Sequence, residues 1–140
     1  NQPKAMFASC QRFGQGQTGR IWQAPKGGVW VSAAIKREGP YENKSQLYGL
    51  AVALALVERI ERIGVNVKIK WPNDLFVDGQ KLAGILPRLF SRGGELRLLR
   101  VGVGLNIFNN ILNGINIINA TSILTPKSPR DKVTQGTPVP

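Results

Sequence analysis

The segment from Val65 to Leu105 constrains the fold most, because it consists of short apolar runs separated by two strong turn signals. Asp78-Gly79 is typical of two-residue β-hairpin turns, in which both positions adopt positive φ. Arg92-Gly93-Gly94 is a second glycine-rich turn signal. The runs 65–70, 74–77, 81–90 and 96–105 are therefore predicted to be strands of an antiparallel meander.

One helix is predicted ahead of this meander. Asn43 with Gln46 three residues later matches a capping box, and Gly64 is a plausible stop. Glu58 and Arg62 form an i,i+4 pair in the favourable orientation. The residues expected to form its buried stripe, at helical spacing, are Leu47, Leu50, Ala51, Leu54, Val57 and Ile60. Such a helix would cover one face of the sheet.

The first 35 residues are predicted to contain two strands and a loop. A strand around residues 5–10 would include Cys10 as a small strand residue, and 29–35 is rich in β-branched residues and Trp. The three glycines between Gly14 and Gly19 predict a flexible loop over 11–20. They match Gly-x-Gly-x-x-Gly, but a dinucleotide fold needs a helix to begin there, whereas Trp22 and Pro25 follow.

Composition limits the possible functions. Nineteen lysines and arginines against eight acidic residues give the 140-residue chain a formal charge of +11, which favours anionic partners. The absence of histidine excludes imidazole catalysis and most zinc sites. Cys10 is the single cysteine, so we expect no internal disulfide and a cytoplasmic location. No apolar run of about 18 residues is present, so no membrane span is expected.

Two lysine-containing motifs carry the chemistry. Lys70-Trp71-Pro72-Asn73-Asp74 precedes Lys81-Leu82-Ala83-Gly84-Ile85-Leu86, so two lysines and a carboxylate lie on short apolar strands. This combination suits an anionic substrate, such as a phosphate or a free carboxylate. The glycine-rich loop ends in Arg20 and Trp22, which could meet a phosphate and stack on a flat base.

Together with Gln11 and the segment from Gly102 to Asn106, these motifs occur in an order that resembles the catalytic domain of biotin–protein ligases. The resemblance implies a partial catalytic domain over 1–125, followed by an extended Pro-rich tail over 126–140. It implies an α+β fold, with a mixed, largely antiparallel sheet backed by helices, like that of class II aminoacyl-tRNA synthetases. It also implies an ATP-dependent ligase that converts biotin to biotinyl-AMP and transfers it to a lysine of a biotin carboxyl carrier protein.

The resemblance assigns a role to each candidate residue. The catalytic group comprises Lys81, Lys70, Asp74 and Arg20. The residues expected to bind biotin are Gln11, Gly14, Gln15, Gln17, Lys81 and Gly84, with Gly84 leaving room for the ring. Those expected to bind ATP are Arg20, Trp22, Asn73 and Asn106, with Trp22 over the adenine and Asn106 at its edge. Mg²⁺ would accompany ATP, with Asp74 as its candidate ligand.

The chain departs from the family pattern at several positions. Gln15 and Gln17 stand where the family loop usually has arginines, so the sequence predicts faster loss of biotinyl-AMP or compensation by another cation such as Arg12. Pro87-Arg88 stands where a glutamate is usual. The family's Ser-Thr-Asn segment, later helices and C-terminal barrel are absent, as in a piece of a longer enzyme.

Two alternative functions remain open. The first is a lipoate or octanoate ligase of the same superfold. The second is a non-catalytic basic relative that binds nucleic acid, although the scattered basic residues make specific binding unexpected. The pattern is compatible with a homodimer, and no membrane partner is expected.

Overall fold

The computed structural model describes residues 2–108, so the tail expected at 126–140 lies outside the described part. The elements, in chain order, are β1 (Lys4–Ala8), β2 (Gln11–Gln15), a 3-10 turn (Gln17–Gly19), β3 (Ile21–Ala24), β4 (Val29–Lys36), α1 (Ser45–Glu61), β5 (Lys68–Lys70), β6 (Asp74–Val77), β7 (Gln80–Arg92) and β8 (Glu95–Leu105). The fold is therefore α+β, as predicted. Within residues 2–108, no helix is long and apolar enough to cross a bilayer.

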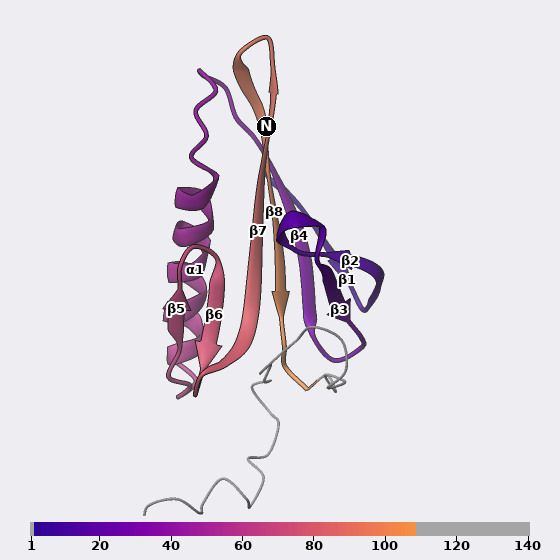
Figure 1. The fold of residues 1–140 in the computed structure, drawn as a ribbon, viewed down its shortest axis with the longest axis vertical. Coiled ribbons are helices and arrows are strands. Elements are labelled where there is room, and N and C mark those ends of the chain that lie inside the picture. The colour runs from indigo at the N-terminus through magenta and orange to yellow at the C-terminus, as the bar shows by residue number, and fades with distance from the viewer. Residues whose placement is uncertain (1, 109–140) are drawn as a thin grey trace, which may run out of the picture.

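The strands form one six-stranded sheet and one separate hairpin. The sheet order is β1-β4-β8-β7-β6-β5, and β2 pairs only with β3. All pairs between these strands are antiparallel. Figure 1 shows α1 beside β5 and β6, with the β2–β3 hairpin at the other side of the molecule. The predicted antiparallel meander is confirmed.

The turns behave as their dipeptides predict. Asp78 and Gly79 have φ of 50° and 76°, and Gly93 and Gly94 have φ of 61° and 76°. These values suit the tight turns that join β6 to β7 and β7 to β8. The strand predicted at 65–70 is shorter, because β5 begins only at Lys68.

The core lies between α1 and one face of the sheet. Alternate residues of β7 and β8 point to this face. Its buried members include Ala53, Leu75, Ala83, Ile85, Leu99, Val101 and Leu105. The opposite face of the central strands is left for the β2–β3 hairpin.

The predicted buried stripe of α1 was partly wrong. Ile60 is buried and Val57 packs against the core, as predicted, but Leu47 and Leu54 are each 55% exposed. Gly49 and Ala53, which were not predicted, are buried. The helix packs closely on β7: a Cβ added to Gly49 would lie 3.4 Å from Cγ of Pro87. Small residues therefore lie where the helix is closest to the sheet, and Leu47 and Leu54 lie on its outer side.

The capping box was also wrong, whereas the end of α1 was close to the prediction. Lys44 occupies the N-cap, and its side chain makes no capping hydrogen bond. The Ser45 hydroxyl instead donates to Oδ1 of Asn43 at 3.1 Å. Glu58 and Arg62 form the predicted ion pair, at 2.5 Å. The chain leaves the helix after Glu61 and turns at Gly64, whose φ is 83°.

The loop predicted at 11–20 contains regular structure. Residues 11–15 form β2, and Gly14 pairs with Trp22 of β3. A Cβ at Gly14 would lie 2.4 Å from the Trp22 carbonyl oxygen, so this glycine permits close approach of two strands. Cys10 lies after β1 and is exposed, so it is not the strand residue that was expected.

Candidate functional site

A row of directly paired residues crosses the sheet on the face opposite α1. Directly paired residues of antiparallel strands point to the same face. We call this set the site row: Ala8, Trp30, Gly104, Gly84, Asp74 and Lys70, from β1 to β5. Its two central members are glycines, so the row has a recess in its middle with Trp30 on one side and Asp74 on the other.

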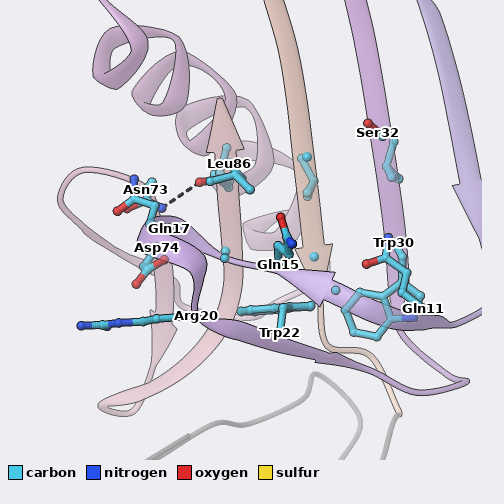
Figure 2. A pocket seen from close by; sticks show the side chains of 18 of the residues that line it. Gln11, Gln15, Gln17, Arg20, Trp22, Trp30, Ser32, Asn73, Asp74 and Leu86 are labelled. Atoms are coloured by element: carbon cyan, nitrogen blue, oxygen red, sulfur yellow. Dashed lines mark hydrogen bonds between the residues drawn. The ribbon is translucent and has the colours of Figure 1, made fainter. Parts of the chain in front are cut away.

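Trp22 fills this recess from the β2–β3 hairpin. A Cβ at Gly104 would lie 2.7 Å from Cε2 of Trp22, and one at Gly84 would lie 3.1 Å from Cζ3. The indole therefore lies directly against the backbone of β7 and β8, and Figure 2 shows it between the hairpin and these strands. Gly84 leaves room for Trp22 in the structure, and the biotin contact expected of this glycine stays a prediction.

A second tryptophan supports the first. Trp30 is buried, and its ring meets Trp22 edge to face, with centroids 6.3 Å apart. Its Nε1 donates to the Pro25 carbonyl at 2.9 Å. The Nε1 of Trp22 is buried without a hydrogen-bond partner among the described residues. A buried donor of this kind is costly unless something satisfies it, so it is a point at which a ligand acceptor would be stabilised.

Lys81 reaches the site row because of a β-bulge. Leu75 pairs with Ala83, but the next residue, Phe76, pairs with Lys81, so Leu82 is the extra residue on β7. The bulge breaks the alternation of β7 and turns Lys81 to the face of Asp74 and Gly84, away from the core. Its Nζ lies 2.8 Å from Oδ2 of Asp74 and 5.3 Å from the Trp22 ring centroid.

The lysines are held differently. The Lys81–Asp74 ion pair is partly buried, with side chains 26% and 23% exposed. Lys70 is the register partner of Asp74, but its Nζ lies over the Phe76 ring, 5.1 Å from the centroid. Asp74 thus has Lys81 as its ion-pair partner and Lys70 as its register neighbour on β5. An arriving anion would compete with Asp74 for Lys81.

Asn73 fixes this end of the site. Its side-chain Nδ2 donates to the Ile85 backbone carbonyl at 2.8 Å, and its own backbone carbonyl accepts from the Ile85 N–H at 2.8 Å. This reciprocal contact ties the segment before β6 to β7, next to Asp74 and Gly84. The side-chain hydrogen bond is drawn in Figure 2. Asn73 therefore positions Asp74, besides the ATP contact that the sequence predicts for it.

The hairpin and the sheet enclose a cavity of about 1000 Å³. All the predicted site residues except Asn106 line it: Gln11, Gly14, Gln15, Gln17, Arg20, Trp22, Lys70, Asn73, Asp74, Lys81 and Gly84. The sequence therefore identified residues that the fold brings together from β2, β3, β5, β6 and β7.

Asn106 is placed elsewhere. It is 3% exposed, its N–H donates to the Leu82 carbonyl at 3.0 Å, and its Nδ2 lies 3.5 Å from the Lys81 carbonyl oxygen. It holds the bulged part of β7 and does not line the cavity. Its contact with adenine stays a prediction. Arg12, the suggested compensating cation, is exposed on β2 and is not a lining residue.

The lining residues that the sequence did not identify include Trp30, Ser32, Arg88 and Arg100. The period of two along β7, from Gly84 through Leu86 to Arg88, is the signal that could have found Arg88. Five cations therefore line the cavity, namely Arg20, Lys70, Lys81, Arg88 and Arg100. Among residues 2–108, Asp74 is the only carboxylate that lines it. The cavity thus favours anionic ligands.

The donor set does not form a resident metal site. In the described part of the chain, no group of three or more Cys, Asp or Glu residues is close enough to hold a metal ion. A single carboxylate next to a cationic cavity does fit Mg²⁺ that arrives bound to phosphates, because Mg²⁺ commonly takes one or two protein carboxylates together with substrate oxygens.

Comparison with known proteins agrees with this geometry. The model of the biotin/lipoate A/B protein ligase family matches residues 1–106, which include the whole sheet and the cavity. The chain belongs to the biotin/lipoate A/B protein ligase family. The match ends at residue 106, and the predicted domain limit at 125 stays a prediction.

Individual members of the family are similar at a moderate level. Over 104 residues the chain is 36% identical to the bifunctional ligase/repressor BirA of Bacillus subtilis, covering 73% of this chain and 32% of that protein. It is 33% identical over 105 residues to the biotin–[acetyl-CoA-carboxylase] ligase of Paracoccus denitrificans, covering 73% and 43%. The chain therefore spans 32% to 43% of the length of these relatives.

A solved structure of a family member supports the fold. The biotin protein ligase of Aquifex aeolicus, in complex with biotin and ATP, superposes with a TM-score of 0.69 at 32% identity. The superposition covers 84% of this chain and 48% of that one. The expected fold, related to class II aminoacyl-tRNA synthetases, is thereby confirmed.

Proposed function

We propose that this chain is part of an ATP-dependent ligase that activates biotin as biotinyl-AMP and transfers the biotinyl group to a lysine of a carrier protein. The observation that carries the proposal is the cavity itself. Lys81, Lys70 and Asp74 meet Trp22 there, in a chain of the biotin/lipoate ligase family. The Aquifex relative is a complex with biotin and ATP, which supports the same pair of ligands here.

In the first step, a biotin carboxylate oxygen would attack the α-phosphorus of ATP, and the bond to the β-phosphate would break to release pyrophosphate. Both reactants are anions, so cations must offset their repulsion. Lys81 would bind the carboxylate and the α-phosphate, and Lys70 would lie beside the phosphates. Each charge-assisted hydrogen bond of this kind contributes about 1.5–3 kcal/mol. Asp74, released from Lys81, would be free to bind the Mg²⁺ of MgATP.

The other lining residues would orient the two substrates. Gln11, Gly14, Gln15 and Gln17 of the hairpin would line the biotin end. Arg20 would contact a phosphate. The exposed surface of the Trp22 ring would stack on adenine, and its unpartnered Nε1 would donate to a ligand acceptor.

In the second step, the ε-amine of a carrier lysine would attack the acyl carbon, release AMP and lose a proton. A biotin carboxyl carrier protein is the expected acceptor, and the absence of a possible internal disulfide suits the cytoplasm. A homodimer remains compatible with the sequence. These assignments rest on the family resemblance and on the charge of the cavity.

The test is biotin-dependent exchange of labelled pyrophosphate into ATP by the 140-residue chain. Lys81→Ala should reduce exchange by at least about tenfold, the loss of one charge-assisted hydrogen bond. Lys36→Ala is the matched control, because Lys36 is a sheet lysine paired with Glu38 at 2.8 Å and does not line the cavity. Equal exchange by wild type and Lys81→Ala would refute the proposal.

The same assay separates the alternatives. Exchange stimulated by lipoate or octanoate in place of biotin would identify the other branch of the family. If the chain shows no exchange and instead binds duplex DNA with a steep dependence on salt, the nucleic-acid alternative is favoured.

A further inference from the structure

A second row of paired residues crosses the cavity face of the sheet. It comprises Lys4, Ala34, Arg100 and Arg88 on β1, β4, β8 and β7, and we call it the arginine row. One intermediate row, with Ser32, Gly102 and Leu86, separates it from the site row. Because strands rise about 3.3 Å per residue, Arg88 lies roughly 13 Å along β7 from Gly84. The arginine row is thus at a different end of the cavity from Asp74.

Arg88 and Arg100 are directly opposite each other in the ladder. Both line the cavity, so two positive charges share one face at neighbouring positions. Like charges in this arrangement destabilise a sheet unless something neutralises them. In residues 2–108, the ion pairs involve Lys36, Lys44, Arg62, Lys81 and Arg97, and neither of these two arginines takes part.

The two arginines differ in their surroundings, and neither is paired with a carboxylate in the described part of the chain. Arg100 is exposed, and its guanidinium lies over the Phe90 ring, with its Cζ 5.4 Å from the centroid. Arg88 is half-buried on the central strand β7, next to Pro87. A cation that an aromatic ring orients, or whose side chain is partly buried, binds an anion at a lower entropic cost than a mobile surface side chain does.

We propose that Arg88 and Arg100 form a second anion subsite that binds a phosphate group. The planar guanidinium presents parallel N–H donors that match two phosphate oxygens, and two such forks on adjacent strands can hold one phosphate together. The phosphate is either a free ion or a phosphate of a bound nucleotide. The subsite requires neither biotin nor the transfer reaction, so it can be tested independently of the proposed ligase activity.

The experiment is calorimetric titration of the 140-residue chain with inorganic phosphate at low ionic strength. Arg88→Gln and Arg100→Gln should each weaken binding by about tenfold or more. Arg97→Gln is the matched control. It removes the same charge from the same strand, and Arg97 is exposed like Arg100, but it pairs with Glu95 at 2.6 Å and does not line the cavity. It should change the affinity by about twofold or less, since a paired charge outside the cavity is screened from the bound phosphate.

A charge-retaining variant guards against loss of folding. Arg88→Lys keeps the charge but loses the paired N–H donors of the guanidinium. It should therefore bind phosphate more weakly than the wild type, although its circular dichroism spectrum should be unchanged. Addition of ATP identifies the source of the phosphate. Displacement of inorganic phosphate by ATP points to the nucleotide, and simultaneous binding of both points to the free ion; either result supports the subsite.

Three results would overturn the proposal. One is the absence of saturable phosphate binding by the wild-type chain. Another is an equal loss of affinity in Arg97→Gln, which would show a general charge effect. The third is a loss of binding in Lys81→Ala while Arg88→Gln binds normally, which would place the anion at the other end of the cavity.

Discussion

The recess that holds Trp22 makes a sharp prediction about two glycines of the same strand. Gly104 and Gly102 are both on β8 and on the same face, separated by one residue. A Cβ at Gly104 would lie 2.7 Å from Cε2 and Nε1 of Trp22, closer than real carbon contacts. A Cβ at Gly102 would lie 3.7 Å from Cβ of Leu86, an ordinary van der Waals distance. Neither glycine has a positive φ.

Gly104→Ala should therefore force the indole outward by several tenths of an ångström. Overpacking of this kind costs about 1–3 kcal/mol. Gly102→Ala should change the free energy of unfolding by less than about 0.5 kcal/mol, as expected for a methyl group that meets no clash. The measurement is urea unfolding followed by circular dichroism, which reports the whole chain rather than the tryptophans alone.

A double-mutant cycle assigns the cost to the indole. In a Trp22→Leu background the clash is removed, so Gly104→Ala should cost less than about 0.5 kcal/mol there, giving a coupling energy above about 1 kcal/mol. A nuclear Overhauser effect between the Trp22 ring and the Gly84 α-protons that is present in the wild type and lost in Gly104→Ala would confirm that the indole is displaced. An equal cost of Gly104→Ala in both backgrounds would refute the packing of Trp22 against β8.

Two further predictions concern Asn73 and Gln17. Asn73→Ala should lower the free energy of unfolding by about 1–3 kcal/mol, because it leaves the Ile85 carbonyl without its donor; Asn43→Ala, an exposed asparagine, should cost less than about 0.5 kcal/mol, and equal losses in urea unfolding would contradict the role of Asn73. Gln17→Arg adds a cation to the cavity and should slow the release of biotinyl-AMP, measured by rapid filtration after the first step. An unchanged release rate would show that charge at this loop position does not retain the adenylate.

The meander was predictable because its turns have a local chemical signature. Asp78-Gly79 and Gly93-Gly94 adopt the positive φ values that these residue types tolerate, so four strands and their antiparallel pairing followed from the sequence. The order of motifs also predicted which residues from β2, β3, β5, β6 and β7 share one cavity. That prediction depended on resemblance, since periodicity alone does not bring distant strands together.

The errors arose where close packing overrides residue type. Hydrophobicity predicted that the leucines of α1 would face the core, but a helix this near to Pro87 places Gly49 and Ala53 there. Glycine content predicted a flexible segment at 11–20, but Gly14 serves the close approach of β2 to β3. The side of α1 that faces the sheet and the conformation of residues 11–20 both depend on distances between elements, and a single sequence does not reveal these distances.

Lys81 illustrates the same limit at the site itself. The spacing of three residues between Lys81 and Gly84 would put them on opposite faces of a regular strand, and only the bulge at Leu82 puts both on the cavity face. The sequence contains no separate signal for that extra residue. The role assigned to Lys81 by resemblance thus preceded any structural reason for it.

The extra residue also decides on which face of β7 the ammonium of Lys81 lies. If the hairpin paired in regular register with Leu82 kept in the ladder, alternation counted from Gly84 would turn Lys81 toward the aliphatic side chains beneath α1, where a charge is costly. Deletion of Leu82 removes the extra residue itself, so Lys81 would stay opposite Phe76 and on the cavity side. A shortening by this one residue therefore preserves the orientation of the lysine, at the cost of a fully buried leucine side chain.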